Sequence, residues 1–282
     1  MERTTGVIAG VALTACLFLI GCDLLPSAGP MVTDSRSIKQ GGAKSVDVQL
    51  NLAVGDLTLS GGAADLMNAE FRYNIPAWKP EVKYSVNGTQ GTLTIRQPRV
   101  SNLPFRNAEN HWDVHLRDVL PMDLAVRSDT GDSDLHLIGL EVSSLTLDSD
   151  TGDARVDLAG RYASLGSVGV SSDTGDCRLR MTGVYPSLTS LKMETDTGDL
   201  DADLSGSWEK GVSGEITCDT GDISVVLPSK VGVYITTHTD TGDVSANGLI
   251  VQGKGYTNAA YGKSPVTLRL DVHTDTGDIT LR

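Results

Sequence analysis

Apolar and polar residues alternate along most of the chain from residue 124 to the C-terminus. Apolar residues occupy every second position before a short polar turn and again after it, as Leu145 and Leu147 do before one turn and Val156 and Leu158 after it. A period of two residues is typical of a β-strand with one buried face, and no stretch shows the 3.6-residue period of a helix. The pattern predicts a series of strand–turn–strand units.

The turn has the same sequence in each of these units. Asp-Thr-Gly-Asp occurs seven times, and its first aspartates are spaced by 21, 23, 23, 23, 21 and 35 residues. A unit that cannot bury its apolar face alone buries it by stacking on its neighbours, so the repeats predict a parallel β-solenoid in which each strand pairs with its equivalent one coil away. An antiparallel sandwich is the alternative, since its strands also recur regularly. Seven identical turns at one phase favour the solenoid.

Upstream of the repeats, residues 46–59 form a degenerate eighth unit, in which Ala53 and Val54 replace the Asp and Thr of the turn. Residues 81–95 predict an antiparallel hairpin that turns at Asn-Gly. Because an open solenoid end needs a cover, we expect this hairpin to cap the N-terminal end. The predicted fold is therefore all-β, a single-stranded parallel β-solenoid of about seven to eight coils with an N-terminal β-hairpin cap.

The first residues of the chain differ in character from the rest. Arg3 precedes an apolar run over residues 7–20, which closes with Leu-Ile-Gly and Cys22. A positive residue before a short apolar run is the pattern of a signal peptide, and the run is shorter than the about 20 residues of a membrane span. The closing tetrapeptide resembles a bacterial lipobox, in which Cys22 takes the lipid; an ordinary signal peptide with a chance cysteine is the alternative. We expect a lipoprotein signal peptide over 1–21, a flexible tether over 22–42, an N-terminal part with the capping hairpin over 43–120 and the repeat solenoid over 121–282.

The composition is typical of a turn-rich β-protein, and the acidic residues of the repeated turns account for its net negative charge. The chain has 31 Gly and 10 Pro but only 3 Trp and 3 Phe. Its net charge of −13 argues against a nucleic-acid-binding surface. The seven Asp-Thr-Gly-Asp copies supply 14 of the 36 acidic residues, so we expect two columns of carboxylates along one edge of the solenoid.

Stacked carboxylates need something to relieve their repulsion. At a spacing of about 4.8 Å, two neighbouring charges repel by roughly 0.9 kcal/mol even in water. Turn hydrogen bonds, salt, shared protons or bound cations would each relieve it, and Ca²⁺ is the natural cation because it binds carboxylate and carbonyl oxygens at variable geometry. A plain turn role and a calcium role both stay open. The candidate calcium ligands are Asp129, Asp132, Asp150, Asp153, Asp173, Asp176, Asp196, Asp199, Asp219, Asp222, Asp240, Asp243, Asp275 and Asp278.

The sequence gives little sign of an enzyme, and we expect no catalytic residues. Asp-Thr-Gly occurs in aspartic proteases, but there two copies face each other, whereas seven copies at a solenoid period do not form such a pair. No Gly-x-Ser-x-Gly motif, phosphate loop or metalloprotease histidine spacing occurs. Cys177 and Cys218 fall two coils apart, too far for a disulfide, so we expect buried thiols. His238 and His273 share one phase of the repeat and are expected to stack on the surface.

Several segments resemble the N-terminal part of toastrack domains of bacterial envelope proteins, including those of cell-wall-active-antibiotic response proteins. The repeats from residue 124 onward resemble the "putative adhesin" family of β-solenoids. The segments that carry the first resemblance run over residues 52–62, 77–84, 91–95, 111–116 and 120–124.

The resemblance implies a non-catalytic binding or scaffold module of the cell envelope, either an adhesin or a module related to envelope stress. With the lipobox it predicts an extracytoplasmic, lipid-anchored protein that meets the membrane through Cys22, with an envelope protein or a glycan as partner. Two other hypotheses stay open: a calcium-stabilised structural module that uses the aspartate columns, and a β-helix enzyme that processes glycans.

Overall fold

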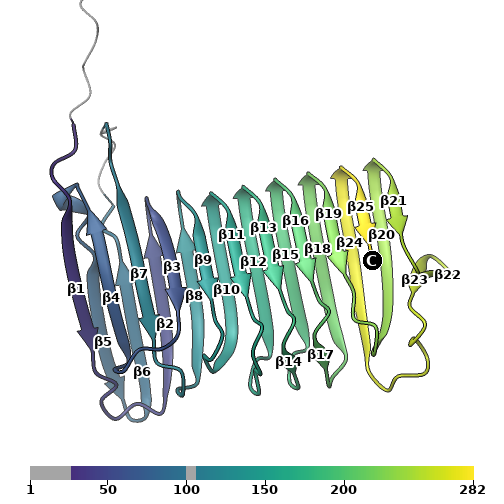
Figure 1. Ribbon diagram of the computed structural model, residues 1–282, viewed down its shortest axis with the longest axis horizontal. Coiled ribbons are helices and arrows are strands. Elements are labelled where there is room, and N and C mark those ends of the chain that lie inside the picture. The colour runs from purple at the N-terminus through teal and green to yellow at the C-terminus, as the bar shows by residue number, and fades with distance from the viewer. Residues whose placement is uncertain (1–26, 100–105) are drawn as a thin grey trace, which may run out of the picture.

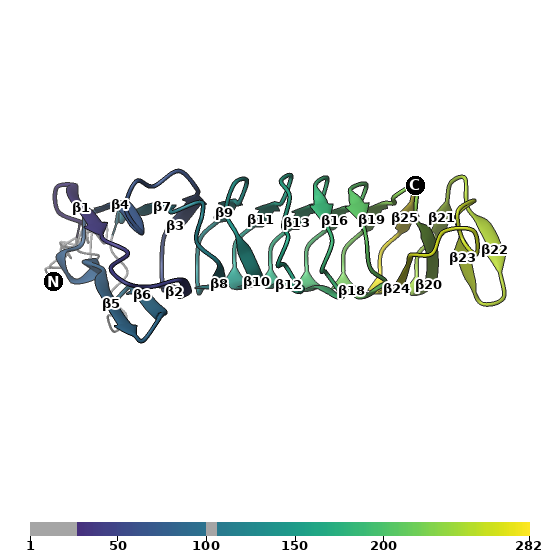
Figure 2. The same cartoon turned by 90° about the horizontal axis from the view of Figure 1, so that it is seen from below.

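The computed structural model describes residues 27–99 and 106–282, so the expected signal peptide and Cys22 lie outside the described residues. The described chain is all-β and elongated. Two large, mostly parallel sheets of 11 and 12 strands run along the molecule (Figure 1) and form its two layers (Figure 2). No helix within the described ranges has the length and apolar character of a membrane span.

Each repeat contributes one strand to each sheet, as the alternation predicts. A longer strand leads into the Asp-Thr-Gly-Asp turn, and a shorter strand leaves it in the other sheet. The repeats comprise β8 (Met122–Ser128), β9 (Ser133–His136), β10 (Val142–Thr151), β11 (Ala154–Asp157), β12 (Ser167–Thr174), β13 (Cys177–Arg180), β15 (Ser190–Thr197), β16 (Leu200–Asp203), β18 (Val212–Thr220), β19 (Ile223–Val226), β20 (Gly232–Thr241), β21 (Val244–Ala246), β24 (Thr267–Thr276) and β25 (Ile279–Leu281). Two short strands, β14 (Val184–Tyr185) and β17 (Ser207–Trp208), pair at the opposite edge.

The core consists of columns of apolar side chains that stack from coil to coil. Leu147, Val170, Met193 and Ile216 occupy equivalent positions on four adjacent strands, and all four side chains are buried. Each such side chain contributes roughly 1.5–3 kcal/mol of burial free energy. The parallel register thus follows from stacking like residues on like.

The N-terminal part extends both sheets. It comprises β1 (Val32–Ile38), β2 (Ser45–Leu52), β3 (Asp56–Ser60), β4 (Met67–Tyr73), the 3₁₀ helix η1 (Pro76–Trp78), β5 (Glu81–Asn87), β6 (Gln90–Arg96) and β7 (Asn110–Leu116). The degenerate unit is confirmed, because β2 and β3 pair in parallel with β8 and β9. The predicted hairpin is also confirmed as antiparallel β5 and β6, with Gly88 at φ +62° in its turn.

The prediction that residues 22–42 form a flexible tether is wrong for part of that range. Residues Val32–Ile38 form β1, which pairs antiparallel with β4 over seven residues. Most of the β1 side chains are exposed, so its hydrogen bonds to β4 hold it rather than burial of an apolar face. A strand of this kind leaves no hydrophobic alternation in the sequence to find.

The coils do not stack in chain order, which corrects the expectation of sequential stacking. The last repeat, β24 and β25, lies between the β18–β19 coil and the β20–β21 coil (Figure 1). The residues that lengthen the last spacing to 35 contain β22 (Ile250–Gln252) and β23 (Gly255–Thr257), which extend the larger sheet beyond β20. At the N-terminal end, β2 likewise lies between β6 and β8. The spacing of 35 residues indicates an insertion, but it does not show between which coils the last repeat lies.

Candidate functional site

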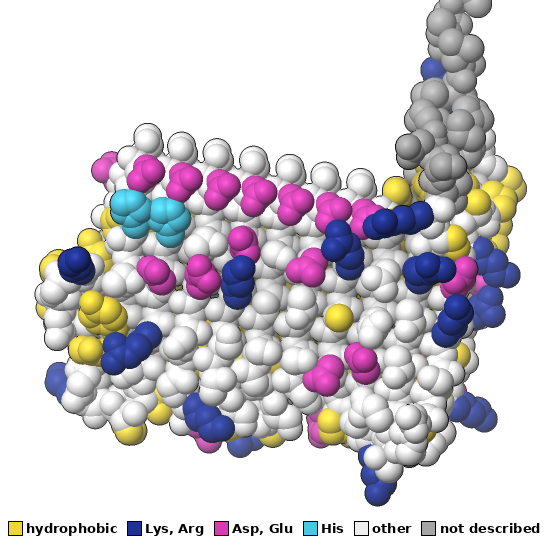
Figure 3. All heavy atoms as spheres, turned by 180° about the vertical axis from the view of Figure 1, so that it is seen from behind, with side chains coloured by type: hydrophobic (Ala, Val, Ile, Leu, Met, Phe, Trp, Pro, Cys, Tyr) yellow, Lys and Arg dark blue, Asp and Glu magenta, His cyan; other side chains and the backbone are white. Residues whose placement is uncertain are grey.

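The Asp-Thr-Gly-Asp turns stack along one edge of the solenoid. Figure 3 shows the resulting row of acidic side chains, with two histidines near one end and basic side chains at the other. The glycine of every turn has a positive φ, between +121° at Gly131 and +151° at Gly221. A methyl group on Gly175 would overlap the carbonyl oxygen of Gly152 in the next coil. Glycine is therefore required both for the backbone conformation and for the close approach of coils.

The second aspartates of the turns form a hydrogen-bonded column. The backbone N–H of Asp153 donates to Oδ1 of Asp132 at 2.9 Å, and the N–H of Asp176 donates to Oδ1 of Asp153 at 3.1 Å. The same bond recurs at every step of the stack, ending where Asp243 donates to Asp278 at 2.9 Å. The second aspartates therefore accept backbone N–H groups, and these hydrogen bonds join neighbouring coils instead of closing a single turn. The column, called the inner column below, contains Asp56, Asp132, Asp153, Asp176, Asp199, Asp222, Asp278 and Asp243.

The first aspartates form the outer column, whose N-terminal end is paired with arginine. Asp129 lies 3.0 Å from Nη2 of Arg99 and 3.5 Å from Nε of Arg127. Arg127 also reaches Oδ1 of Asp150 at 3.0 Å. Two arginines thus neutralise much of the charge at this end of the column.

The C-terminal end of the outer column is paired with histidine. Nε2 of His238 lies 2.9 Å from Asp240, and Nε2 of His273 lies 2.7 Å from Asp275. The two rings stack with centroids 5.1 Å apart and an interplanar angle of 3°, which confirms the expected surface pair.

The middle of the outer column is unpaired. Within residues 27–99 and 106–282, the side chains of Asp173, Asp196 and Asp219 have no hydrogen-bond or ion-pair partner. Their strands are consecutive in the sheet, in the order β12, β15, β18, so like charges stand one strand spacing apart. In the same part of the chain, no group of three or more His, Cys, Asp or Glu side chains is arranged to hold a metal ion. The candidate calcium ligands therefore lie where the repeats predict, in two columns on one edge, without converging into a cluster.

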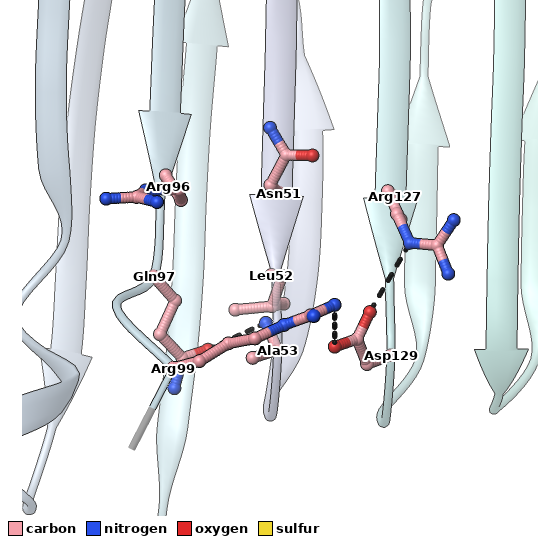
Figure 4. A pocket seen from close by; sticks show the side chains of 8 residues that line it. All are labelled: Asn51, Leu52, Ala53, Arg96, Gln97, Arg99, Arg127 and Asp129. Carbon is pink, nitrogen blue, oxygen red and sulfur yellow. Dashed lines mark hydrogen bonds and ion pairs between the residues drawn. The ribbon is translucent and has the colours of Figure 1, made fainter. Parts of the chain in front are cut away.

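The outer column stops where the degenerate unit begins, and a cavity opens there. Leu52 pairs with Ser128, which places Ala53 beside Asp129, in the position of the missing aspartate. A cavity of about 320 Å³ surrounds this position (Figure 4). The sequence analysis did not predict this cavity, although Ala53 in place of the repeated aspartate indicates where the column is interrupted. The cavity is lined by Asn51, Leu52, Ala53, Arg96, Gln97, Arg99, Arg127 and Asp129.

Polar side chains from three neighbouring coils form this cavity. In Figure 4 the side chain of Arg99 passes Ala53 to reach Asp129. Arg96 lies on β6 and pairs with Glu81 at 2.9 Å, which lowers the pKa of that carboxyl through the hydrogen bond and the arginine charge. Gln97, whose side chain is buried, accepts the N–H groups of Ala53 at 3.0 Å and Val54 at 2.9 Å. In the described part of the molecule, its Nε2 finds no acceptor.

A second cavity of about 300 Å³ lies on the other sheet and combines two aspartates with arginines. Asp201 and Asp203 line it with Arg178, Arg180 and Arg282. Paired carboxylates beside a basic residue are what a glycan-processing enzyme would need. Here, however, Arg178 holds Asp201 at 3.0 Å, and Oδ1 of Asp203 accepts the N–H of Ser205 at 3.1 Å. These bonds favour an ion-paired sheet surface over a free acid–base pair.

An aromatic column inside the opposite edge was also missed by the sequence reasoning. Tyr162 stacks on Tyr185 with centroids 5.9 Å apart, and Tyr185 contacts Trp208 at 4.9 Å. The hydroxyl of Tyr162 donates to the carbonyl of Leu137 at 3.0 Å. Burial raises the pKa of both tyrosines. The three residues recur at the 23-residue period, which was the available signal.

Both cysteines of the described chain are free and buried, as predicted. Burial raises the pKa of Cys177 to about 12 and that of Cys218 to about 11. Since only the thiolate reacts, we expect neither residue to be alkylated by iodoacetamide at pH 8 in the folded protein, and both to be alkylated in guanidinium chloride. Mass spectrometry of the two peptides measures this. Alkylation of either cysteine before unfolding would contradict the burial.

The raised pKa values of the two thiols also make the free energy of unfolding depend on pH. The folded protein binds these thiol protons more tightly than the unfolded chain, whose thiols have a pKa of about 9. The contribution to stability is therefore complete below about pH 9 and is lost as the pH rises above it.

The fold shows the class of protein: an all-β repeat protein with two mostly parallel sheets, stacked turns and an N-terminal extension of both sheets. Residues 27–179, more than half of the chain, match the family model described as "N-terminal domain of toast_rack, DUF2154". The chain therefore belongs to the toast_rack family. No curated protein matches it.

Solved structures resemble the chain over most of its length. A "putative cell adhesion protein" from Clostridium sporogenes is 27% identical, with a TM-score of 0.48, covering 89% of this chain and 99% of that chain. A "putative adhesin" from Parabacteroides distasonis is 10% identical, with a TM-score of 0.40 and coverage of 90% and 99%. A "putative lipid binding protein" from the same organism is 8% identical, with a TM-score of 0.42 and coverage of 90% and 98%. These TM-scores are all below 0.5, so the family assignment rests on the sequence match.

Proposed function

We propose that this chain is a non-catalytic binding module of the bacterial cell envelope, held on the extracytoplasmic side of the membrane by a lipid on Cys22. The observation that carries the binding role is the arginine-lined cavity at the end of the outer column. It is a hollow in which several polar groups converge on a hydrogen-bonded edge, and convergent polar groups are what orients a ligand in a binding site. Adhesion, which the names of some structural neighbours state for those proteins, is one form of such binding.

The groups in the cavity suit binding better than reaction. Arginine side chains donate hydrogen bonds and do not lose their protons, and the amide of Asn51 donates and accepts without titrating. Asp129, the carboxylate of the cavity, is held between Arg99 and Arg127. Such a set recognises a polar or charged ligand and orients it.

Photo-crosslinking in the native cell tests the binding role. A photoreactive amino acid at Asn51 faces the cavity, whereas one at Ile138 is 55% exposed outside it and serves as the control. We expect a defined crosslinked product from position 51 and none from position 138. Equal products from both positions, or none from either, would contradict a binding site in this cavity.

The lipid anchor is supported by the Leu-Ile-Gly sequence before Cys22, after an apolar run. Cells grown with an alkyne analogue of palmitate should label the protein, and Cys22→Ser should abolish the label and release the protein from the membrane fraction. The chain provides its own control, since Cys177→Ser should keep both. An unlabelled wild-type protein would rule out the anchor.

The calcium-stabilised module is the second candidate, and the three unpaired carboxylates at Asp173, Asp196 and Asp219 are the observation in its favour. This candidate predicts a higher Tm in millimolar CaCl₂ than in NaCl of the same ionic strength. Coinciding melting curves would rule the calcium-stabilised module out.

A further inference from the structure

The outer column is a regular array with one position missing at its N-terminal end. Seven aspartates occupy equivalent places on successive strands, and the eighth place holds Ala53. A methyl group fills much less space than a carboxymethyl group. The cavity therefore includes the place where the repeat elsewhere puts a carboxylate.

The side chains around this place are those that bind a carboxylate. Arg99 reaches across it from the coil beyond, and its bond to Asp129 at 3.0 Å uses one of its five N–H donors. Arg127, on the strand that leads into Asp129, is paired with Asp129 and Asp150. Guanidinium groups bind carboxylates through paired, charge-assisted hydrogen bonds. The place left by Ala53 thus lies against the guanidinium group of Arg99.

The backbone beside the cavity has no strand edge to offer a peptide. Gln97 occupies the N–H groups of Ala53 and Val54. Nδ2 of Asn110 donates to the Val54 carbonyl at 2.6 Å. A peptide that adds to a sheet needs such groups free, whereas sugar hydroxyls bond to polar side chains. Asn51 and Arg99 supply these, and a volume of about 320 Å³ lies at the small end of the range for small-ligand sites.

We propose that this cavity binds an acidic sugar, a uronate residue alone or within a glycan, with its carboxylate in the place left by Ala53 and bonded to Arg99. The inference rests on the proposed binding function and names its ligand class. The sugar hydroxyls face the amide of Asn51, which lines the same cavity.

The decisive variant is Ala53→Asp, because it supplies the carboxylate from the chain itself. Isothermal titration of the wild-type protein with glucuronate should show binding that weakens with added salt, and glucose should show none. Ala53→Asp and Arg99→Gln should each weaken glucuronate binding about tenfold or more, with a Tm close to that of the wild type. Val54→Asp is the matched control: it adds the same charge at the next residue, outside the cavity lining, and should keep most of the affinity.

Several outcomes would overturn the proposal. These are no glucuronate binding by the wild type, equal affinity in Ala53→Asp, or tighter binding of inorganic phosphate than of glucuronate. The crosslinking at Asn51 separates this failure from that of the proposed function: crosslinks without glucuronate binding would refute the acidic-sugar ligand alone, whereas absence of both would refute the site.

Discussion

Gly198→Ala should be among the most damaging single substitutions in the repeats. Gly198 has φ +140°, a conformation nearly confined to glycine, and a methyl group there would overlap the Gly175 carbonyl of the neighbouring coil. The coil would have to move away from its neighbour and weaken the hydrogen bonds on both sides. We expect a loss of at least about 3 kcal/mol in unfolding free energy and a fall in Tm of roughly 10 °C.

Thermal unfolding followed by circular dichroism measures this, with Gly248→Ala as the control. Gly248 also has a positive φ, +73°, but open space surrounds the place of its missing methyl group. Its substitution should cost only the backbone strain, about 1 kcal/mol. If the two variants had the same Tm, close stacking of the turns would not explain the repeated glycine.

The two aspartate columns should respond in opposite directions to loss of their side chains. In the inner column, Asp176 accepts the N–H of Asp199 at 3.0 Å. Asp176→Ala removes this charge-assisted bond and should lower the unfolding free energy by about 1–3 kcal/mol. Asp176→Asn keeps an oxygen acceptor in place and should recover most of the loss. Equal losses in the two variants would show that the bond between coils is not the reason for the aspartate.

In the outer column, the triple variant Asp173→Asn, Asp196→Asn and Asp219→Asn should be more stable than the wild type. These carboxylates have no partner in the described chain and stand about 4.8 Å apart, so their removal relieves repulsion of roughly 1–3 kcal/mol at low salt. The gain should shrink in 1 M NaCl, because salt screens the same repulsion. Asp201→Asn, which removes a carboxylate paired with Arg178, should give no such gain. Destabilisation by the triple variant at every salt concentration would indicate a binding role for the column, such as calcium.

The repeats made much of this fold predictable. Alternating residues such as Leu145 and Leu147 show which face of each strand is buried, and an identical turn at a constant phase shows that coils stack on coils. The degenerate unit could be recognised because its alternation survives although Ala53 has replaced the aspartate. The hairpin could be recognised from its Asn-Gly turn. All of these are local patterns, repeated often enough to specify their neighbours.

The candidate site was predictable only in part. The two columns of carboxylates follow from the repeats, and so does their place on one edge. The arginine cavity does not, because Arg96 and Arg99 lie more than 40 residues from Ala53 in the sequence and meet it only when β6 pairs with β2. Nor does the sequence distinguish Asp176, which bonds the next coil, from Asp173, which bonds nothing described. That difference depends on where a turn directs each side chain.

The sequence by itself determined the class of fold, the phase of the turns and the need for glycine, because these follow from period-two alternation and from a motif that is copied seven times. Only the tertiary structure decided the order of the coils. The last repeat enters between two earlier ones, and the strand β2 of the degenerate unit lies between β6 and the first repeat. The physical reason is that every repeat presents nearly the same apolar columns and the same turn, so a coil fits against several neighbours. One order of the coils is then selected by the connections between them and by the β22–β23 hairpin that follows β20 in the larger sheet.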